Sequence, residues 1–456
     1  MKRLPQKLTT LKSSLSLLDA IALVVGLVIG AGIFETPSFV AANAGGTEIA
    51  LLTWAAGGVV SLIGALCYAE LATTYPHPGG NYYYLRRAFG RSIAFLFAWT
   101  RMSVIQTGSI ALLAFVFGDY ASQLWRLGNY SAAIYAAMSI VLFTGLNIFG
   151  VQQGKWVQNL LAVAQVVGLL IVSGIGLAFS FASISAISID PNTYTTVQAS
   201  LVAQAAPTVS SNVGLMMVFV LLTYGGWNEA AYISAEVRNG RRKIVLALVW
   251  SVAIIAGLYL LLNWALIREL GLVRMAASNT VVAELMRSTV GEVGVVLISL
   301  LVVVATLCSI NATIFTGART NYALGQDFAI FAPLERGGEN TPTNALLIQG
   351  VISIVLVLIG SITRQGFETM VDFTAPAFWF FFLLSGLSLF VLRRRDPDLD
   401  RPFKVPLYPL LPILFCGICV YMLQASLAYT GWGGLLGVVV LLLGIPLLWW
   451  SQKLSS

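Results

Sequence analysis

The chain has 456 residues, of which 58% are hydrophobic and only 10% are charged. Soluble domains carry about 25% charged residues, so a water-facing shell cannot cover this much apolar sequence. The composition therefore excludes an ordinary soluble protein and predicts an all-α polytopic membrane protein.

Twelve apolar segments are long enough to cross a bilayer, since a hydrocarbon core of about 30 Å needs roughly 20 apolar residues per helix. The first of them is too long for a cleavable signal segment. The predicted spans cover residues 16–42, 47–75, 90–118, 131–150, 156–181, 213–236, 243–267, 293–325, 343–361, 368–392, 405–428 and 432–450.

The distribution of Lys and Arg predicts the orientation of the chain in the membrane. If the N-terminus is cytoplasmic, twenty Lys and Arg lie in or near inside loops, five lie outside, and Arg101 lies within the third span. The positive-inside rule then places both termini in the cytoplasm of a multi-pass protein in the cell membrane. The net charge of +7 is thus a topology signal and not a nucleic-acid footprint.

The sequence offers little for catalysis or for metal binding. His77 is the only histidine and falls in a predicted cytoplasmic loop, and all four cysteines fall within spans. Cys416 and Cys419 have a CxxC spacing, but one such pair in an apolar helix is more typical of packing than of redox or metal chemistry. We therefore predict no enzyme activity, no catalytic residues, no cofactor and no metal site.

Two glycine clusters predict interrupted helices. The run GLVIGAGIF at residues 26–34 and the run TYGGWN at residues 223–228 place glycines near mid-membrane in the first and sixth spans. Single glycines let helices pack closely, but each costs about 1 kcal/mol in a helix relative to alanine. Unwound backbone at this depth must be buried in protein or line a wet cavity. Two breaks, one in each half of the chain, predict one shared site.

The chemistry of such breaks suits a zwitterion. Free N–H groups at the start of the outer half of the first span can bind an α-carboxylate. Free carbonyls at the end of its inner half, and at the end of the outer half of the sixth span, can bind an α-ammonium group. The predicted substrate-binding residues are Ile29, Gly30, Ala31, Gly32, Ile33, Phe34, Tyr224, Gly225, Gly226, Trp227 and Asn228.

Ionisable residues at membrane depth are candidates for function. Glu35 and Glu229 directly follow the two breaks. Either can face the cavity and favour a cationic substrate, or can cap a half-helix or pair with a buried arginine. Both readings stay open for Glu229, and we favour the structural one for Glu35. Glu70, Arg101 and Asp372 are interpreted as members of buried networks or as interface residues.

Several motifs resemble a known family. Residues 26–34 are similar to the GxxxGxGIF signature of amino-acid permeases. Residues 64–82, 225–228, 309–316 and 393–406 resemble the corresponding regions of the L-type branch of the amino acid, polyamine and organocation transporters. This resemblance implies a leucine-transporter-like fold with a 5+5 inverted repeat, broken spans 1 and 6, and two added spans. It also implies amino-acid transport by alternating access.

The implied division of the chain has five parts. Residues 1–15 are a cytoplasmic tail, 16–181 the first repeat, 182–212 an extracellular connection, 213–392 the second repeat, and 393–456 spans 11 and 12 with a short cytoplasmic tail. Because the break in span 6 contains no carboxylate, we predict a neutral L-amino acid as substrate, moved across the plasma membrane. The alternative is a polyamine or cationic amino-acid permease, which could be proton-coupled. A channel is disfavoured because the sequence shows neither a filter-like repeat nor a charged ring.

Three departures from the family pattern refine the prediction. Ala31 replaces a small hydroxyl residue in the first break, and Gln165 falls where proton-coupled relatives carry a lysine. Gln165 cannot titrate, but its amide can bond to the carbonyls of span 1 or to a hydroxyl such as that of Ser309. Gln165, Glu229 and Ser309 are therefore candidates for coupling or selectivity, and we predict exchange or facilitated transport. Residues 119–130 lack the Cys that links a heavy chain in eukaryotic L-type chains, so no such partner is expected.

Overall fold

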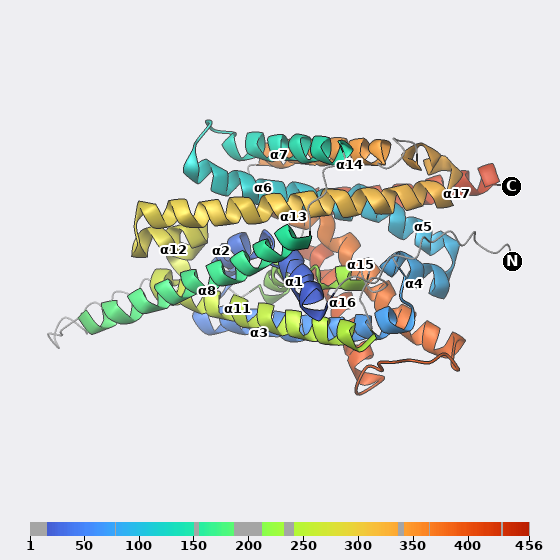
Figure 1. Ribbon diagram of the computed structural model, residues 1–456, viewed down its shortest axis with the longest axis horizontal. Coiled ribbons are helices and arrows are strands. Elements are labelled where there is room, and N and C mark those ends of the chain that lie inside the picture. The colour runs from blue at the N-terminus through green and yellow to red at the C-terminus, as the bar shows by residue number, and fades with distance from the viewer. Residues whose placement is uncertain are drawn as a thin grey trace.

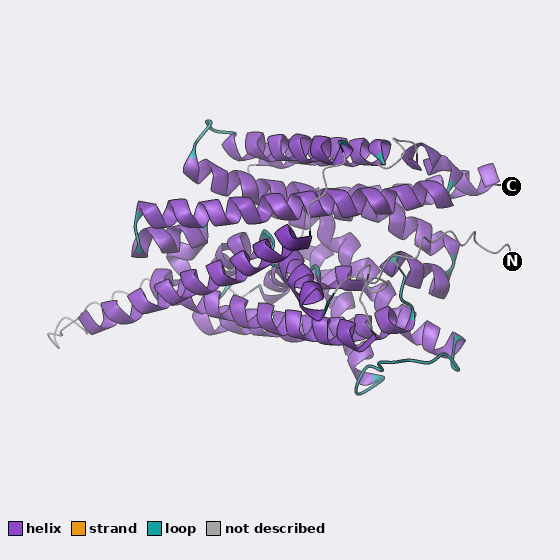
Figure 2. Ribbon diagram, in the orientation of Figure 1, coloured by secondary structure: helices purple, strands orange, loops and turns teal. Residues whose placement is uncertain are grey.

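The computed structural model describes residues 16–77, 79–149, 155–186, 212–231, 241–335, 342–363, 365–429 and 432–455. All secondary structure in these residues is helical, as Figure 2 shows. The longest helices lie side by side along the long axis of the molecule (Figure 1). The all-α prediction is therefore confirmed.

Ten continuous stretches of helix in the described residues are long and apolar enough to cross a membrane. A broken pair, α1 and α2, bends by 45° and raises the number to eleven. The continuous stretches are α3 (Thr47–Thr74), α5 (Arg91–Thr100) continued by η1 (Arg101–Ile105) and α6 (Gln106–Leu124), α7 (Ser131–Ile148), α8 (Lys155–Ala186), α11 (Arg241–Ala276), α13 (Glu292–Asp327), α14 (Thr343–Thr363), α15 (Gly366–Arg395), α16 (Leu410–Tyr429) and α17 (Trp432–Ser455).

The remaining predicted span, the sixth, consists of α10 (Val213–Thr223) and the 3-10 turn η2 (Trp227–Ala231). It continues into residues 232–240, which lie outside the described residues. The structure thus fits a polytopic membrane protein, and the count of twelve spans stays a prediction. Most of the predicted extracellular connection also lies outside the described residues.

Some predicted boundaries were wrong. The third span continues past residue 118 to Leu124; the fifth span ends at Phe181 as predicted, although helix α8 itself continues to Ala186. The eleventh span begins at Leu410 and not at residue 405, because the prolines at 406 and 409 interrupt a helix there. Three short helices were missed because they are too short for a hydropathy window: α4 (Gly80–Phe89), α12 (Val281–Thr289) and η3 (Ala329–Glu335).

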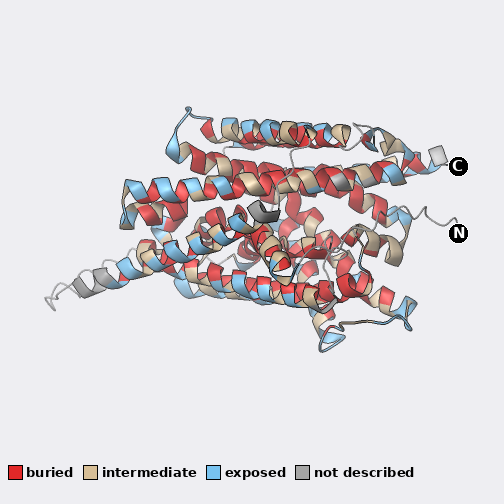
Figure 3. Cartoon of the chain, in the orientation of Figure 1, coloured by how far each residue is buried: buried red, intermediate tan, exposed pale blue. Residues whose placement is uncertain are grey.

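Burial separates a central group of helices from a peripheral one. In the apolar window of the third span 72% of residues are buried, against 22% in that of α17. Figure 3 shows buried residues along the interior faces and exposed ones along the outer faces. Leu142, Ile362 and other large apolar residues are exposed on these outer faces, where lipid tails are their natural solvent.

Buried and half-buried charged side chains link the C-terminal end of α3 to that of α15. Glu70 is 1% exposed, and its carboxylate accepts a hydrogen bond of 2.7 Å from Nε of Arg393 and one of 2.7 Å from the backbone N–H of Val405. Arg87 donates to Asp396 at 3.0 Å. The interpretation of Glu70 as a network member is confirmed, and the network joins α3 to the end of α15.

Candidate functional site

The first break interrupts span 1 where the sequence places its glycines. α1 (Leu17–Val28) ends as the Ile29 amide donates to the Val25 carbonyl at 2.8 Å, and the Gly30 amide then turns back to the Val28 carbonyl at 2.7 Å. α2 (Gly32–Asn43) starts directly afterwards. The first amides of a helix have no preceding turn to accept their hydrogen bonds, so residues 31–33 present N–H groups at this point.

The second break approaches the first one closely. α10 ends at Thr223, and Gly226 has a φ of +109°, a conformation that favours glycine. A Cβ atom at Gly226 would lie 3.2 Å from Cγ2 of Val28 and 3.3 Å from the carbonyl oxygen of Leu27. The structure therefore brings the two predicted breaks together, with the backbone of one against the last turn of the other.

A tyrosine that sequence reasoning missed joins the two breaks. The hydroxyl of Tyr259, on α11, lies 3.0 Å from the carbonyl oxygen of Val28 and 3.4 Å from that of Thr223. These are the terminal carbonyls of α1 and α10, the groups predicted to bind an ammonium. A tyrosine inside an apolar span carries no local signal of such a role. Thr36 adds a second link, because its hydroxyl lies 2.7 Å from that of Thr223.

We expect Tyr259→Phe to weaken transport without preventing membrane insertion. The change removes the donor to the buried Thr223 carbonyl and one of the two donors to the Val28 carbonyl, and an unmet buried acceptor costs about 1–3 kcal/mol. The expected loss is roughly 5- to 150-fold in the apparent affinity for substrate or in the rate of exchange. Uptake by purified variant in liposomes measures it, and Tyr135→Phe, whose hydroxyl donates to the Trp125 carbonyl in an exposed region, is the matched control. Equal uptake by both variants would contradict the role of Tyr259.

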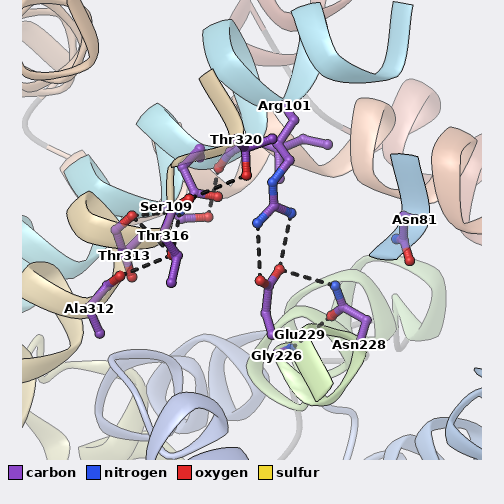
Figure 4. A network of polar contacts seen from close by, with 12 residues as sticks. Asn81, Arg101, Ser109, Gly226, Asn228, Glu229, Ala312, Thr313, Thr316 and Thr320 are labelled. Carbon is purple, nitrogen blue, oxygen red and sulfur yellow. Dashed lines mark hydrogen bonds and ion pairs between the residues drawn. The ribbon is translucent and has the colours of Figure 1, made fainter. Parts of the chain in front are cut away.

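A buried arginine neutralises the carboxylate beside the second break. Arg101 is 4% exposed and donates from its two terminal nitrogens to Glu229 at 3.1 and 3.0 Å (Figure 4). Asn228 donates to the same carboxylate at 3.4 Å and accepts from the Gly226 amide at 3.3 Å. Of the two open readings of Glu229, this geometry favours the pair with a buried arginine. Arg101 is confirmed as a member of a buried network.

The two sides of the breaks differ in how tightly they are packed. Hydroxyls of α13, among them Thr313 and Thr316, lie to the left of Glu229 in Figure 4. Thr316 is exposed, and the side chain of Glu229 is 24% exposed. In α2, by contrast, Phe34 is 1% exposed and meets the ring of Tyr120 edge-on at 5.9 Å. The packing is thus closer at the α2 side of the breaks than at the η2 side.

The other predicted site residues are packed. Trp227 is buried between Tyr68, at 5.2 Å between ring centroids, and Phe382, at 5.5 Å. Gln165 is buried, and its Oε1 has no hydrogen-bond partner among the described residues. The Ser309 hydroxyl donates to the Ala305 carbonyl of its own helix at 3.2 Å. The hydrogen bond suggested between Gln165 and Ser309 is therefore not formed here.

Comparison with known proteins agrees with this architecture. The family described as amino acid permease matches residues 15–445. The chain belongs to this family. The permease is 30% identical to the b(0,+)-type amino acid transporter 1 of Mus musculus, over 98% of this chain and 91% of that protein. It is 25% identical to the serine/threonine exchanger SteT of Bacillus subtilis, over 97% and 98% of the two chains.

A third relative is the cystine/glutamate transporter of Homo sapiens, which is 26% identical over 98% of the permease and 88% of the relative. The matches cover nearly the whole permease, including both breaks. The prediction of a transporter of the L-type branch is confirmed. The permease is a multi-pass membrane transporter for amino acids and not an enzyme.

Proposed function

We propose that this permease moves neutral L-amino acids across the plasma membrane by alternating access, through exchange or facilitated transport. The observation that supports a neutral substrate is the Arg101–Glu229 pair. It cancels the carboxylate nearest the second break, and residues 224–226 contain no other. A cationic side chain would therefore find no unpaired charge at that point.

The backbone of the two breaks supplies the groups for the rest of the substrate. The amides of residues 31–33 and the positive end of the α2 dipole favour the α-carboxylate. The α-ammonium group would share or replace the hydrogen bond that Tyr259 makes to the carbonyls of Val28 and Thr223. The close packing at Phe34 and the looser packing at Glu229 support an asymmetric state of the kind that alternating access requires.

The proposal includes twelve spans in a 5+5 inverted repeat with two added spans, and both termini in the cytoplasm. The five proposed parts of the chain are divided after residues 15, 181, 212 and 392. Exchange is supported by the likeness of the permease to the serine/threonine exchanger SteT. We expect no disulfide-linked heavy chain, which agrees with the position of the four cysteines inside helices. The rival, a polyamine or cationic amino-acid permease, would rest on Glu229 and Glu35.

Uptake by purified permease in liposomes tests the function. Vesicles loaded with an unlabelled amino acid should take up labelled neutral L-amino acids, and competition should rank Lys, Arg and polyamines below them. No proton should move through position 165. Uptake should therefore follow a substrate gradient and respond weakly to a pH gradient imposed across the membrane. Stronger competition by Lys or Arg than by every neutral amino acid would reverse the assignment of substrate.

A further inference from the structure

Three carboxylates come together where the outer part of span 1 meets spans 3 and 10. Glu35 lies in the first turn of α2, Asp119 near the end of α6, and Glu368 in the first turn of α15. Glu35 and Asp119 adjoin Phe34 and Tyr120, whose rings are in contact, and Glu368 lies two residues from Gly366, where a Cβ atom would overlap the Phe115 ring of α6. The elements around them are tied together, since Tyr120 donates to the Phe34 carbonyl at 3.3 Å and Phe219 lies between Phe39 and Phe367.

Glu35 is the deepest of the three. It is 6% exposed, and its Oε1 is buried with no hydrogen-bond partner among the described residues. No ion pair of Glu35 is found in the described part of the chain, and Asp119 and Glu368 are half-buried. The described residues thus show neither the helix cap nor the ion pair that was predicted for the Glu35 side chain.

Two other carboxylates of this chain, the buried Glu70 and the half-buried Glu229, show what an ionised one requires. Glu70 has Arg393 and the Val405 amide, and Glu229 has Arg101. Glu35 has no such cation and has two like charges close by. The positive end of the α2 dipole favours the ionised form of Glu35, but this effect is small beside the desolvation of an unpaired buried ion. A bound proton removes both the desolvation and the repulsion.

The described side chains of the helices packed against α2 include no cation paired with Glu35. α10 has no ionisable side chain, and Tyr259 of α11 is engaged by the two breaks. On α12, Arg287 pairs with Glu284 at 2.8 Å and with Glu292 at 3.0 Å. Other described charged groups on neighbouring elements include Arg268 over the ring of Phe181, Glu269 beside Ser288, Arg274 paired with Glu284, Asp372 against Gly433, and exposed Glu48.

We propose that Glu35, with Asp119 and Glu368 beside it, is a proton-binding site, and that its proton favours the binding of the substrate carboxylate at the start of α2. This second part rests on the proposed function. An ionised Glu35 would place a negative charge in the same helical turn as the amides of residues 31–33. A proton and a carboxylate bound there stabilise each other, and by linkage substrate affinity rises as pH falls. Gln165 takes no part in this step.

The first test needs no substrate. The folded protein holds a proton at Glu35 that the unfolded chain releases near neutral pH, so this contribution is present in acid and is lost as pH rises. We compare thermal unfolding of purified wild type, Glu35→Gln and the control Glu48→Gln in detergent from about pH 5 to pH 8. The unfolding temperature of Glu35→Gln should rise relative to that of wild type by roughly 2 °C for each unit of pH increase. The difference in unfolding temperature between Glu48→Gln and wild type should not change with pH.

A constant difference between Glu35→Gln and wild type at every pH would overturn the proposal. So would stabilisation of wild type, but not of Glu35→Gln, by sodium or potassium at fixed pH, because that result assigns the site to a cation. If Glu35→Gln does not fold, Asp119→Asn and Glu368→Gln decide. Each variant removes one repelling charge, so the pH at which the thermal stability falls should be lower than in wild type. The same pH dependence in both variants and in wild type would overturn the proposal.

The second test measures binding of labelled L-serine, L-leucine and L-phenylalanine over the same pH range. In wild type the affinity should weaken by up to about tenfold per pH unit above the midpoint, and in Glu35→Gln it should not change with pH. Binding that is equally independent of pH in wild type overturns the linkage. Absence of binding at every pH contradicts the proposed function instead, and leaves the thermal comparison to decide the proton site.

Discussion

Gly32→Ala should abolish most transport, whereas Gly174→Ala should leave it unchanged. A Cβ atom at Gly32 would lie 2.5 Å from Oγ1 of Thr223 and 2.9 Å from its Cβ, while one at Gly174 meets nothing within 4 Å. The Thr223 side chain is short, buried and hydrogen-bonded to Thr36, so the helices themselves must move apart. Overpacking of this kind costs about 1–3 kcal/mol, which corresponds to a loss of roughly 5- to 150-fold.

The measurement is exchange by purified protein in liposomes, normalised to the amount of inserted protein. Gly30→Ala adds a sharper comparison from the same break, because its Cβ would lie 3.5 Å from Leu113, an ordinary contact. It should lose far less activity than Gly32→Ala. Equal losses for both variants would show that the close contact between α2 and Thr223 does not govern transport.

Arg101→Met should reduce uptake of neutral amino acids and increase competition by Lys and Arg. The change removes the partner of Glu229 and leaves a carboxylate at the second break. Breaking a buried ion pair costs about 3–5 kcal/mol, and the low end applies because the side chain of Glu229 is 24% exposed. The unpaired carboxylate then attracts a cationic side chain, as the rival reading of this site requires.

The matched variants are Glu229→Gln and the double variant Arg101→Met/Glu229→Gln. Glu229→Gln should unfold at a lower temperature than Arg101→Met, because it strands an arginine side chain that is only 5% exposed. The double variant removes both charges and should recover much of the stability and the preference for neutral substrates. Additive losses in the double variant, with no gain for Lys or Arg in Arg101→Met, would refute the role assigned to the pair.

The helical architecture and both breaks could be predicted from local sequence. Apolar segments of membrane length determine spans, and glycines near residues 30 and 226 mark the points where a helix cannot continue cheaply. The short helix α4 and the extension of α6 to Leu124 escaped prediction because a hydropathy window averages over polar and apolar faces.

The partners of the site residues could not be predicted in the same way. Tyr259 lies 231 positions from Val28, and Arg101 lies 128 from Glu229. No local pattern records such contacts, because they depend on how the helices pack. The same limit applies to Glu35, for which an ion pair or cap was favoured; only the fold shows that Asp119 and Glu368, both acidic, are its neighbours.

The π-helical turn η1 (Arg101–Ile105) limits where a gap can be placed when sequences of this kind are aligned. Here the Gln106 amide bonds to the Arg101 carbonyl, five residues back, so the helix holds one more residue than a regular α-helix would. In an α-helix, side chains five apart differ in direction by roughly 140°. The π-helical turn reduces the angle between the directions of the two side chains. Arg101 can therefore reach Glu229 while Gln106 donates to the Thr313 carbonyl at 2.7 Å. Deleting one residue between them would keep the span hydrophobic and its length nearly unchanged, yet would rotate one of these two side chains away from its partner.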